Sequence, residues 1–420
     1  MLPPKSRKSW DQPAGSIAMD RINIIPIFIS TFFKRMPDFF RGKHQMLFIW
    51  LILLIACGVG DYKLTTMACY GSGFVTEWRF RRLLSASYWD LRPIFTWFLS
   101  EIIKKLPIPE DKTLYVIVDG SKKEKRSKKN PYMQKGKIRT NAAWFFGIRF
   151  CVLMIAWGNY RIPVDFRILY PKKHKKYRNE NKLFRDMLKQ FTPPLWAKQV
   201  VIMGDTAYAS VDNMQYIRNR AKKEWKQNKI SWWFVFSMSK TWKFSDGKSL
   251  RDLARHIKKE CYQKIFVPKT SSNHKQCFWT FSKSVNLRHI GNVTIVLSKK
   301  RRNLGPKNVK VIVTNLPNVT VTQILSIYQR RFMIEVLFRE LKSGMGLGKM
   351  QVTKDENRIE KSIGLSILAY LLILKMQHKD ISDNQCWSIF SLREKFRHTV
   401  MKNQFNHDYK LLEGKLKNAA

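Results

Sequence analysis

The sequence predicts an α/β fold in which a mixed sheet follows a helical domain and is interrupted by a β-rich insertion. Three observations support this prediction. Residues 21–108 show helical apolar periodicity. Two short apolar runs, residues 113–120 and 198–205, end at or beside an aspartate, as buried strands do where they enter a loop. Residues 224–320 alternate β-branched and aromatic runs with turn residues.

The N-terminal part is expected to hold a leader and a helical domain. Residues 1–20 are polar with scattered prolines, which is typical of an unstructured leader. Basic stretches in residues 21–108 make this domain a candidate for DNA binding, with a purely structural helical cap as the alternative. The apolar run 46–60 is shorter than the about 20 residues that span a bilayer, so we expect a buried helix and no membrane partner. A membrane segment is the alternative.

Residues 109–223 read as the first part of the core, in the order strand, strand, strand, helix, strand, helix. Residues 143–157 and 161–170 flank Gly158-Asn159, a dipeptide typical of a hairpin turn. Residues 179–191 and 207–221 have helical patterns. This is the order of an RNase H-like core, a mixed sheet whose first and fourth strands lie side by side. Asp119 and Asp205 would then lie at C-terminal strand ends, where sites gather in open α/β sheets.

The second part of the core is expected at residues 321–377, after the β-rich insertion at 224–320. A helix is predicted over residues 322–344, ending at glycines. A second, largely apolar helix over 358–377 should pack under the sheet. Residues 378–420 read as a polar, basic tail.

The helix at 322–344 has a polar row and an apolar stripe. At about 100° of rotation per residue, Tyr328, Arg331, Glu335 and Lys342 fall within roughly 60° of arc, with Arg339 at its edge. Glu340 is rotated by about 120° from Tyr328 and leaves this face. The opposite side carries Ile327, Ile334, Leu337, Phe338 and Leu341.

Charge indicates the class of partner. The chain has 78 Lys and Arg against 30 Asp and Glu, a formal net charge of +48 in 420 residues. Such self-repulsion is tolerated when a polyanion binds, and nucleic acid is the partner we favour over a membrane surface or a generally basic proteome. The six cysteines have neither zinc nor paired spacing. This fits a reducing cytoplasm, and we expect the protein to be cytoplasmic and nucleoid-associated.

Asp119, Asp205 and Glu335 are the candidate catalytic residues. Phosphodiester cleavage is served by two divalent cations, and Mg²⁺ prefers carboxylate oxygens. Each acid also has an ordinary alternative: Asp119 as part of an Asp-Gly turn, Asp205 as a helix N-cap, and Glu335 as the partner of Arg331 or Arg339 in a surface ion pair.

The run Tyr328-x2-Arg331-x3-Glu335-x6-Lys342 resembles the signature of DDE transposases of the insertion-sequence-four family. Asp119 in VIVDGS and Asp205 in VIMGDTAYAS match the upstream acids of that family. The resemblance covers residues 114–376 and includes an insertion domain between the second and third acids. It implies that Asp119, Asp205 and Glu335 bind Mg²⁺ or Mn²⁺ as the catalytic triad.

The resemblance also implies a reaction and an assembly. Such enzymes hydrolyse a strand at the transposon end, and the freed 3′-hydroxyl attacks target DNA. Two ends are brought together, which implies a homodimer. Hairpin-forming relatives carry a Trp in the strand before the signature helix, and residues 307–317 have none. The alternative from another class is an inactive or domesticated relative that binds DNA without cutting it.

Overall fold

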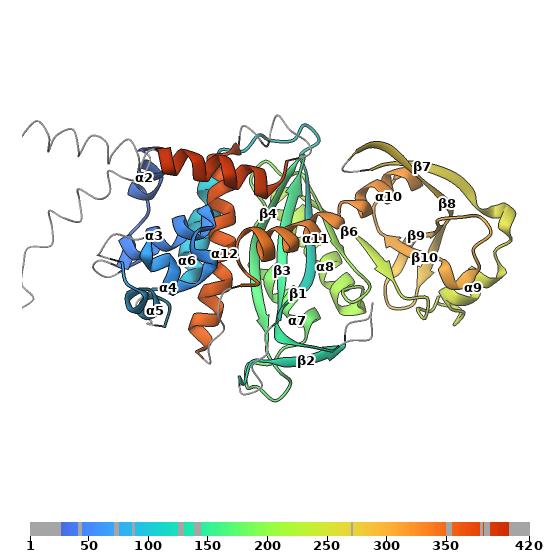
Figure 1. Ribbon diagram of the computed structural model, residues 1–420. Helices are drawn as coiled ribbons and strands as arrows, with labels where there is room; N and C mark the ends of the chain where they lie inside the picture. The colour runs from blue at the N-terminus through green and yellow to red at the C-terminus, as the bar shows by residue number, and fades with distance from the viewer. Residues whose placement is uncertain are drawn as a thin grey trace, which may run out of the picture.

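The structure is a computed structural model that describes residues 27–40, 44–70, 75–85, 89–124, 130–137, 144–269, 272–349, 355–378, 381 and 387–402. The expected leader, residues 1–20, lies outside these ranges. Figure 1 shows the N-terminal helices at one end, the sheet in the middle and the strands of the insertion at the other end.

The N-terminal end is helical, as predicted. The long apolar run forms α3, in which ten residues are buried. It therefore belongs to the protein core, and no helix in the described ranges is long and apolar enough to cross a membrane. The helices of this part are α2 (Ile27–Lys34), α3 (His44–Cys57), α4 (Leu64–Cys69), α5 (Glu77–Ser85) and α6 (Leu91–Ile103).

The central sheet has the predicted order. Its first strand pairs antiparallel with β3 and in parallel with β5, the fourth strand of the predicted core. The hairpin between β3 and β4 turns at Gly158-Asn159, with Trp157 opposite Tyr160. Helices α7 and α8 connect β4 to β5 and β5 to β6. The elements are β1 (Thr113–Glu124), β2 (Gln134–Lys137), β3 (Trp144–Trp157), β4 (Tyr160–Leu169), α7 (Glu180–Gln190), β5 (Gln199–Gly204), α8 (Val211–Asn228) and β6 (Ser231–Met238).

The insertion continues this sheet. β10 pairs antiparallel with β6, and β9, β8 and β7 follow, so that ten described strands form one sheet. Residues 231–238 were expected to belong to the insertion, but this strand pairs in parallel with β5. A strand buried on both faces reads as one apolar run wherever it lies in a sheet, so its pattern does not reveal which strands it pairs with. The added elements are α9 (Leu250–His256), β7 (Gln263–Lys269), β8 (Ser272–Leu287), β9 (Gly291–Lys299) and β10 (Lys310–Thr314).

The helix predicted over 322–344 is divided into three pieces: α10 (Val321–Gln329), α11 (Phe332–Arg339) and the π-helix η5 (Glu340–Gly344). Between the first two, the amides of Arg330, Arg331, Met333 and Ile334 bond to carbonyls three residues back. This is a 3₁₀ turn, which rotates more per residue than an α-helix. The two irregularities change the direction of side chains along the helix.

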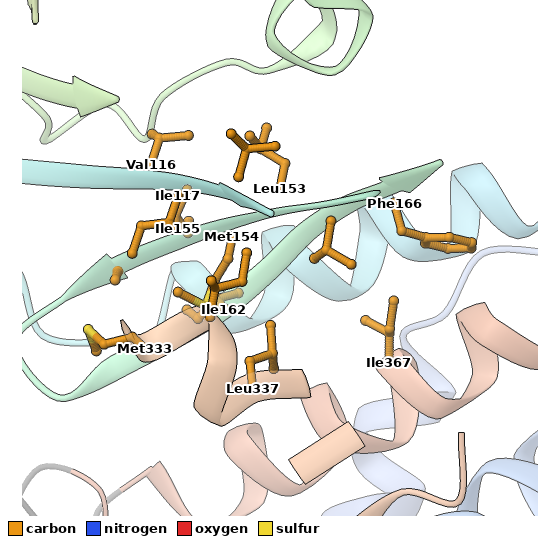
Figure 2. Packing of buried hydrophobic residues seen from close by; sticks show 14 of the residues in the cluster. Val116, Ile117, Leu153, Met154, Ile155, Ile162, Phe166, Met333, Leu337 and Ile367 are labelled. Carbon is orange, nitrogen blue, oxygen red and sulfur yellow. The ribbon is translucent and has the colours of Figure 1, made fainter. Parts of the chain in front are cut away.

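Helix α12 (Glu356–Met376) packs against α3, α6 and β4, so it joins the N-terminal helices to the sheet rather than only covering the sheet. Figure 1 shows it between these two parts. In Figure 2, Met333 and Leu337 of α11 face Met154 and Ile162 of the hairpin, with Ile367 of α12 beside them. The apolar side predicted for α11 is therefore the side that packs on the sheet.

The predicted tail is partly structured. Residues 389–402 form a helix, in which Ile389, Leu392 and Phe396 are buried. Arg393 donates to the carbonyl of Gly344 at 3.1 Å and so ties this helix to the end of η5. This helix was not predicted, because three apolar residues in a basic surrounding give a weak signal.

A buried ion pair joins four segments of the chain. Glu340 is 2% exposed and accepts two hydrogen bonds from Arg161 of β4, at 2.6 and 3.0 Å. The hydroxyl of Tyr370 in α12 lies 3.4 Å from the same carboxylate, and the amide of Ile389 lies 3.2 Å from it. The guanidinium of Arg161 also lies 3.5 Å from the centre of the Trp387 ring. Glu340 is thus a structural residue, and it lies away from the carboxylates of the cavity described below.

We predict that Glu340→Gln lowers the free energy of unfolding by about 3–5 kcal/mol, because it leaves Arg161 as a buried charge without its counter-charge. The measurement is denaturant unfolding followed by circular dichroism. Glu335→Gln is the control, since a half-exposed pair contributes only about 0.3–0.5 kcal/mol. Equal stability of the two variants would contradict the structural role of Glu340.

Candidate active site

The end of β5 and the middle of β1 bring two aspartates together. Asp119 was predicted at a strand end or in an Asp-Gly turn, and both predictions were wrong, because pairing with β3 continues β1 through Asp119 to Glu124. Ile117 of β1 pairs with Met203 of β5, and the same register continued by two residues places Asp119 opposite Asp205. β5 ends at Gly204, whereas β1 continues to Glu124 paired with β3. One edge of β1 is therefore open from Asp119 onwards.

A cavity of about 1060 Å³ lies at this open edge. Its lining includes all three predicted carboxylates together with basic and aromatic side chains. The residues that matter below are Asp119, Asp205, Glu335, Lys122, Arg149, Glu180, Tyr208, Arg339 and Lys342. The structure thus brings together Asp119, Asp205 and the glutamate of α11 around one cavity.

Each aspartate is held by a local backbone amide. Asp119 accepts a hydrogen bond from the amide of Gly120 at 2.8 Å, and Asp205 accepts one from Ala207 at 2.8 Å. Asp205 does not cap α8, because the side chain of Ser210 occupies the N-cap position and accepts from Asn213. The capping alternative for Asp205 is therefore wrong.

Arg331 lies between two of the carboxylates. It donates to Asp119 at 3.2 Å and forms an ion pair with Glu335 four residues along the helix. The ion-pair alternative for Glu335 is therefore realised, but Arg331 also reaches across to the strand. Its guanidinium is the internal counter-ion of the site.

The carboxylates of Asp119, Asp205 and Glu335 are suitable ligands for a divalent cation, but in this structure they are not close enough together to bind one. In the part of the chain that the structure describes, no three His, Cys, Asp or Glu side chains are grouped closely enough to hold a metal ion as they stand. Arg331 accounts for this, since it occupies the space between Asp119 and Glu335. The Glu335 side chain is 41% exposed, and Arg331 is the partner with which it forms an ion pair. Hard carboxylate oxygens on one cavity wall are what Mg²⁺ or Mn²⁺ requires.

The electrostatics of the cavity favour a cation. Burial and the nearby Asp205 carboxylate raise the pKa of Asp119 from 3.8 to about 6, against the lowering effect of Arg331. Burial and nearby Lys122 lower the pKa of the Lys342 ammonium. A cation bound beside the clustered carboxylates would therefore stabilise their charged forms. An anion bound beside Lys342 would stabilise its ammonium in the same way.

Tyr328 does not share this cavity. It is buried in a neighbouring cavity of about 340 Å³, and the ammonium of Lys310 lies 4.5 Å from its ring. The prediction of one continuous polar face was wrong for this residue, because the 3₁₀ turn at Arg330 and Arg331 rotates α10 relative to α11. Arg339 and Lys342 line the cavity of the carboxylates, as the spacing predicted.

Two charged residues of the cavity were missed by the sequence analysis. Arg149 lies in the middle of β3, and Glu180 lies in the first turn of α7. A signal was present for Arg149, because it is the one charged residue in the run from Trp144 to Trp157. Glu180 has no comparable signal, since an acid in the first turn of a helix is ordinary.

We predict that Asp119→Asn stabilises the metal-free protein at pH 7.5, by about 1–3 kcal/mol. The folded state binds this proton more tightly than the unfolded chain does, so the wild type loses stability as pH rises from about 4 to about 6. The gain should therefore vanish below pH 4. Thermal unfolding of both proteins in a chelator, at pH 7.5 and below pH 4, checks this prediction. A gain in stability of the same size at the two pH values would show that the Asp119 charge is not its cause.

Comparison with known proteins identifies a family for most of the chain. The family model described as "Transposase DDE domain" matches residues 112–372. No curated protein matches the chain. Among solved structures, the piggyBac transposase synaptic complex with hairpin DNA is 12% identical, with a TM-score of 0.49 over 94% of this chain and 79% of that one. The NurA nuclease from Sulfolobus solfataricus is 13% identical, with a TM-score of 0.22 over 70% and 95%. At these TM-scores, neither likeness adds to the assignment.

Proposed function

The chain belongs to the transposase DDE domain family, and we propose that it is an active insertion-sequence transposase of the insertion-sequence-four type. It would hydrolyse DNA at the ends of its element and join the freed 3′-hydroxyl to target DNA. The observation that carries this proposal is the position of Asp119, Asp205 and Glu335 around one cavity at the open edge of β1.

Asp119, Asp205 and Glu335 would hold the divalent ions that this family generally uses, Mg²⁺ or Mn²⁺, in a site for two. When bound, such ions activate the attacking water or hydroxyl and stabilise the leaving oxygen. Arg331 would release Glu335 so that its carboxylate turns toward the two aspartates. The guanidinium would then face the DNA, where it can bind a phosphate through two hydrogen bonds.

Arg339 and Lys342 are the next contacts that we propose for DNA. Both line the cavity beside Glu335, and burial already makes the Lys342 charge costly. A phosphate at this wall would relieve that cost, which supports a role in holding the DNA backbone. Tyr328 would act from the neighbouring cavity and not beside the scissile phosphate.

The partners follow from the same reaction. DNA at the element's ends and at the target would be bound by a chain with a formal net charge of +48. We propose a homodimer, because two ends must be joined to one target, and a nucleoid-associated location in the cytoplasm.

A second function, DNA binding without cleavage, is favoured by one observation. The ion pairs of Arg331 with Asp119 and Glu335 hold two of the three carboxylates away from any metal. If these pairs persist on DNA, the protein would bind the ends of its element and leave them intact.

We predict that Asp119→Asn, Asp205→Asn and Glu335→Gln each abolish Mg²⁺-dependent nicking of a labelled transposon end and leave DNA binding within about twofold. Each removes a carboxylate that the ions need and adds no bulk. Glu260→Gln, an exposed carboxylate outside the cavity, is the control and should nick as the wild type does. Nicking by Glu335→Gln at the wild-type rate would refute the catalytic role and leave the binding function.

A further inference from the structure

A second charged pair lies in the same cavity, at the wall formed by β3 and α7. Arg149 forms an ion pair with Glu180, and both side chains line the cavity of the three carboxylates. The Arg149 side chain is 39% exposed and that of Glu180 is 23% exposed, so the pair faces solvent only in part. A partly buried charge in an apolar strand costs free energy unless a partner compensates it.

Strand geometry places this pair on the opposite face of the sheet from Asp119. Arg149 pairs with Lys122 of β1, and alternate residues of a strand point to opposite faces. Asp119 is three residues from Lys122, so their side chains leave β1 on different sides. Because the edge of β1 is open beyond Asp119, one cavity reaches both faces.

Gly120 makes room for the pair. A Cβ atom at this position would lie 3.3 Å from a carboxylate oxygen of Glu180 and 3.6 Å from the hydroxyl of Tyr208. The missing side chain lets Glu180 come close to the backbone of β1 directly beside Asp119. Glu180 thereby holds the Arg149 guanidinium at the cavity wall.

The cavity thus has cations on both sides of its carboxylates. Arg339 and Lys342 line it from the side of α11, and Arg149 lines it from the side of α7. A DNA backbone that crosses the open edge of β1 passes both groups. An arginine has five N–H donors. Among the described residues, Arg149 donates through Nη2 to Glu180, which leaves donors for a phosphate.

We propose that Arg149 binds a phosphate of the DNA on the α7 side of the carboxylates, and that Glu180 is a positioning residue that orients its guanidinium. This inference rests on the proposed function, since it takes DNA as the ligand of the cavity. The inference adds a DNA contact outside the run from Tyr328 to Lys342. It also explains why a glycine follows Asp119, since a side chain at Gly120 would crowd Glu180.

The test measures DNA binding by the full chain in a chelator, so that it does not depend on nicking. The probe is a labelled duplex with the end sequence that flanks the gene. Arg149→Ala should lower its affinity about tenfold and reduce the slope of log K against log salt concentration by about 1. Arg149→Lys keeps the charge but loses the planar guanidinium that can donate two hydrogen bonds to one phosphate. The affinity of this variant should therefore lie between that of the wild type and that of Arg149→Ala.

Arg255→Ala is the matched control, because it removes one arginine that also neighbours an acid but lies on α9, outside the cavity. It should leave the salt slope unchanged. Thermal unfolding of all variants verifies that they fold. Wild-type affinity and salt slope in a folded Arg149→Ala protein would overturn the proposal.

Glu180 variants separate positioning from metal binding. Glu180→Gln keeps an oxygen acceptor for Arg149 and should bind DNA nearly as the wild type does, whereas Glu180→Ala should resemble Arg149→Ala. The Mn²⁺ concentration at half-maximal nicking should not change in Glu180→Gln. A tenfold increase in that concentration, with DNA binding in chelator unchanged for both Glu180 variants, would make Glu180 a metal ligand and overturn its positioning role. Absence of nicking in the wild type would refute the proposed enzyme without affecting the binding result.

Discussion

The parallel pairing of β1 with β5 is the constraint on which the candidate site depends. It sets Asp119 and Asp205 opposite each other, although 80 or more residues separate them in the chain. The early end of β5 is equally important, because it leaves β1 open along one edge and creates the cavity. The glutamate of α11 reaches the same place because the apolar side of that helix packs on the hairpin of β3 and β4. Sheet register and helix packing together define the site before any ligand is present.

Two glutamates of one helical segment have opposite roles. Glu340 is buried, bonded to Arg161 and contacted by α12 and by residue 389. Glu335 stands at the cavity and is partly exposed. A buried charge that is fully hydrogen-bonded holds its element in one orientation, since any rotation would leave it without partners. Glu340 therefore fixes the rotation of this segment, and that rotation leaves Glu335 at the wall of the cavity.

The sequence was sufficient to predict those elements whose pattern lies within one short segment. The hairpin at Gly158-Asn159, the strand that ends beside Asp205 and the buried α3 all follow from short patterns, and all are confirmed. The predicted end of the first strand at Asp119 was wrong, because its pairing with β3 continues to Glu124. The predicted position of Tyr328 was wrong. An angular projection assumes a uniform helix, whereas a 3₁₀ turn and a π-helix interrupt the helix predicted over 322–344. Two features that were not predicted depend on contacts between distant segments: the pairing of β6 with β5, and the ion pair of Arg149 with Glu180. No pattern within a single segment reports such contacts.

Arg331 decides between a binding protein and an enzyme, because it now neutralises two of the three carboxylates. The most direct test is the position of manganese, located by its anomalous scattering, in a crystal of the full chain with a transposon-end duplex. Our account predicts Mn²⁺ in contact with oxygens of Asp119, Asp205 and Glu335, and Arg331 turned to a phosphate. Manganese bound away from Glu335, with Arg331 still between Asp119 and Glu335, would contradict it.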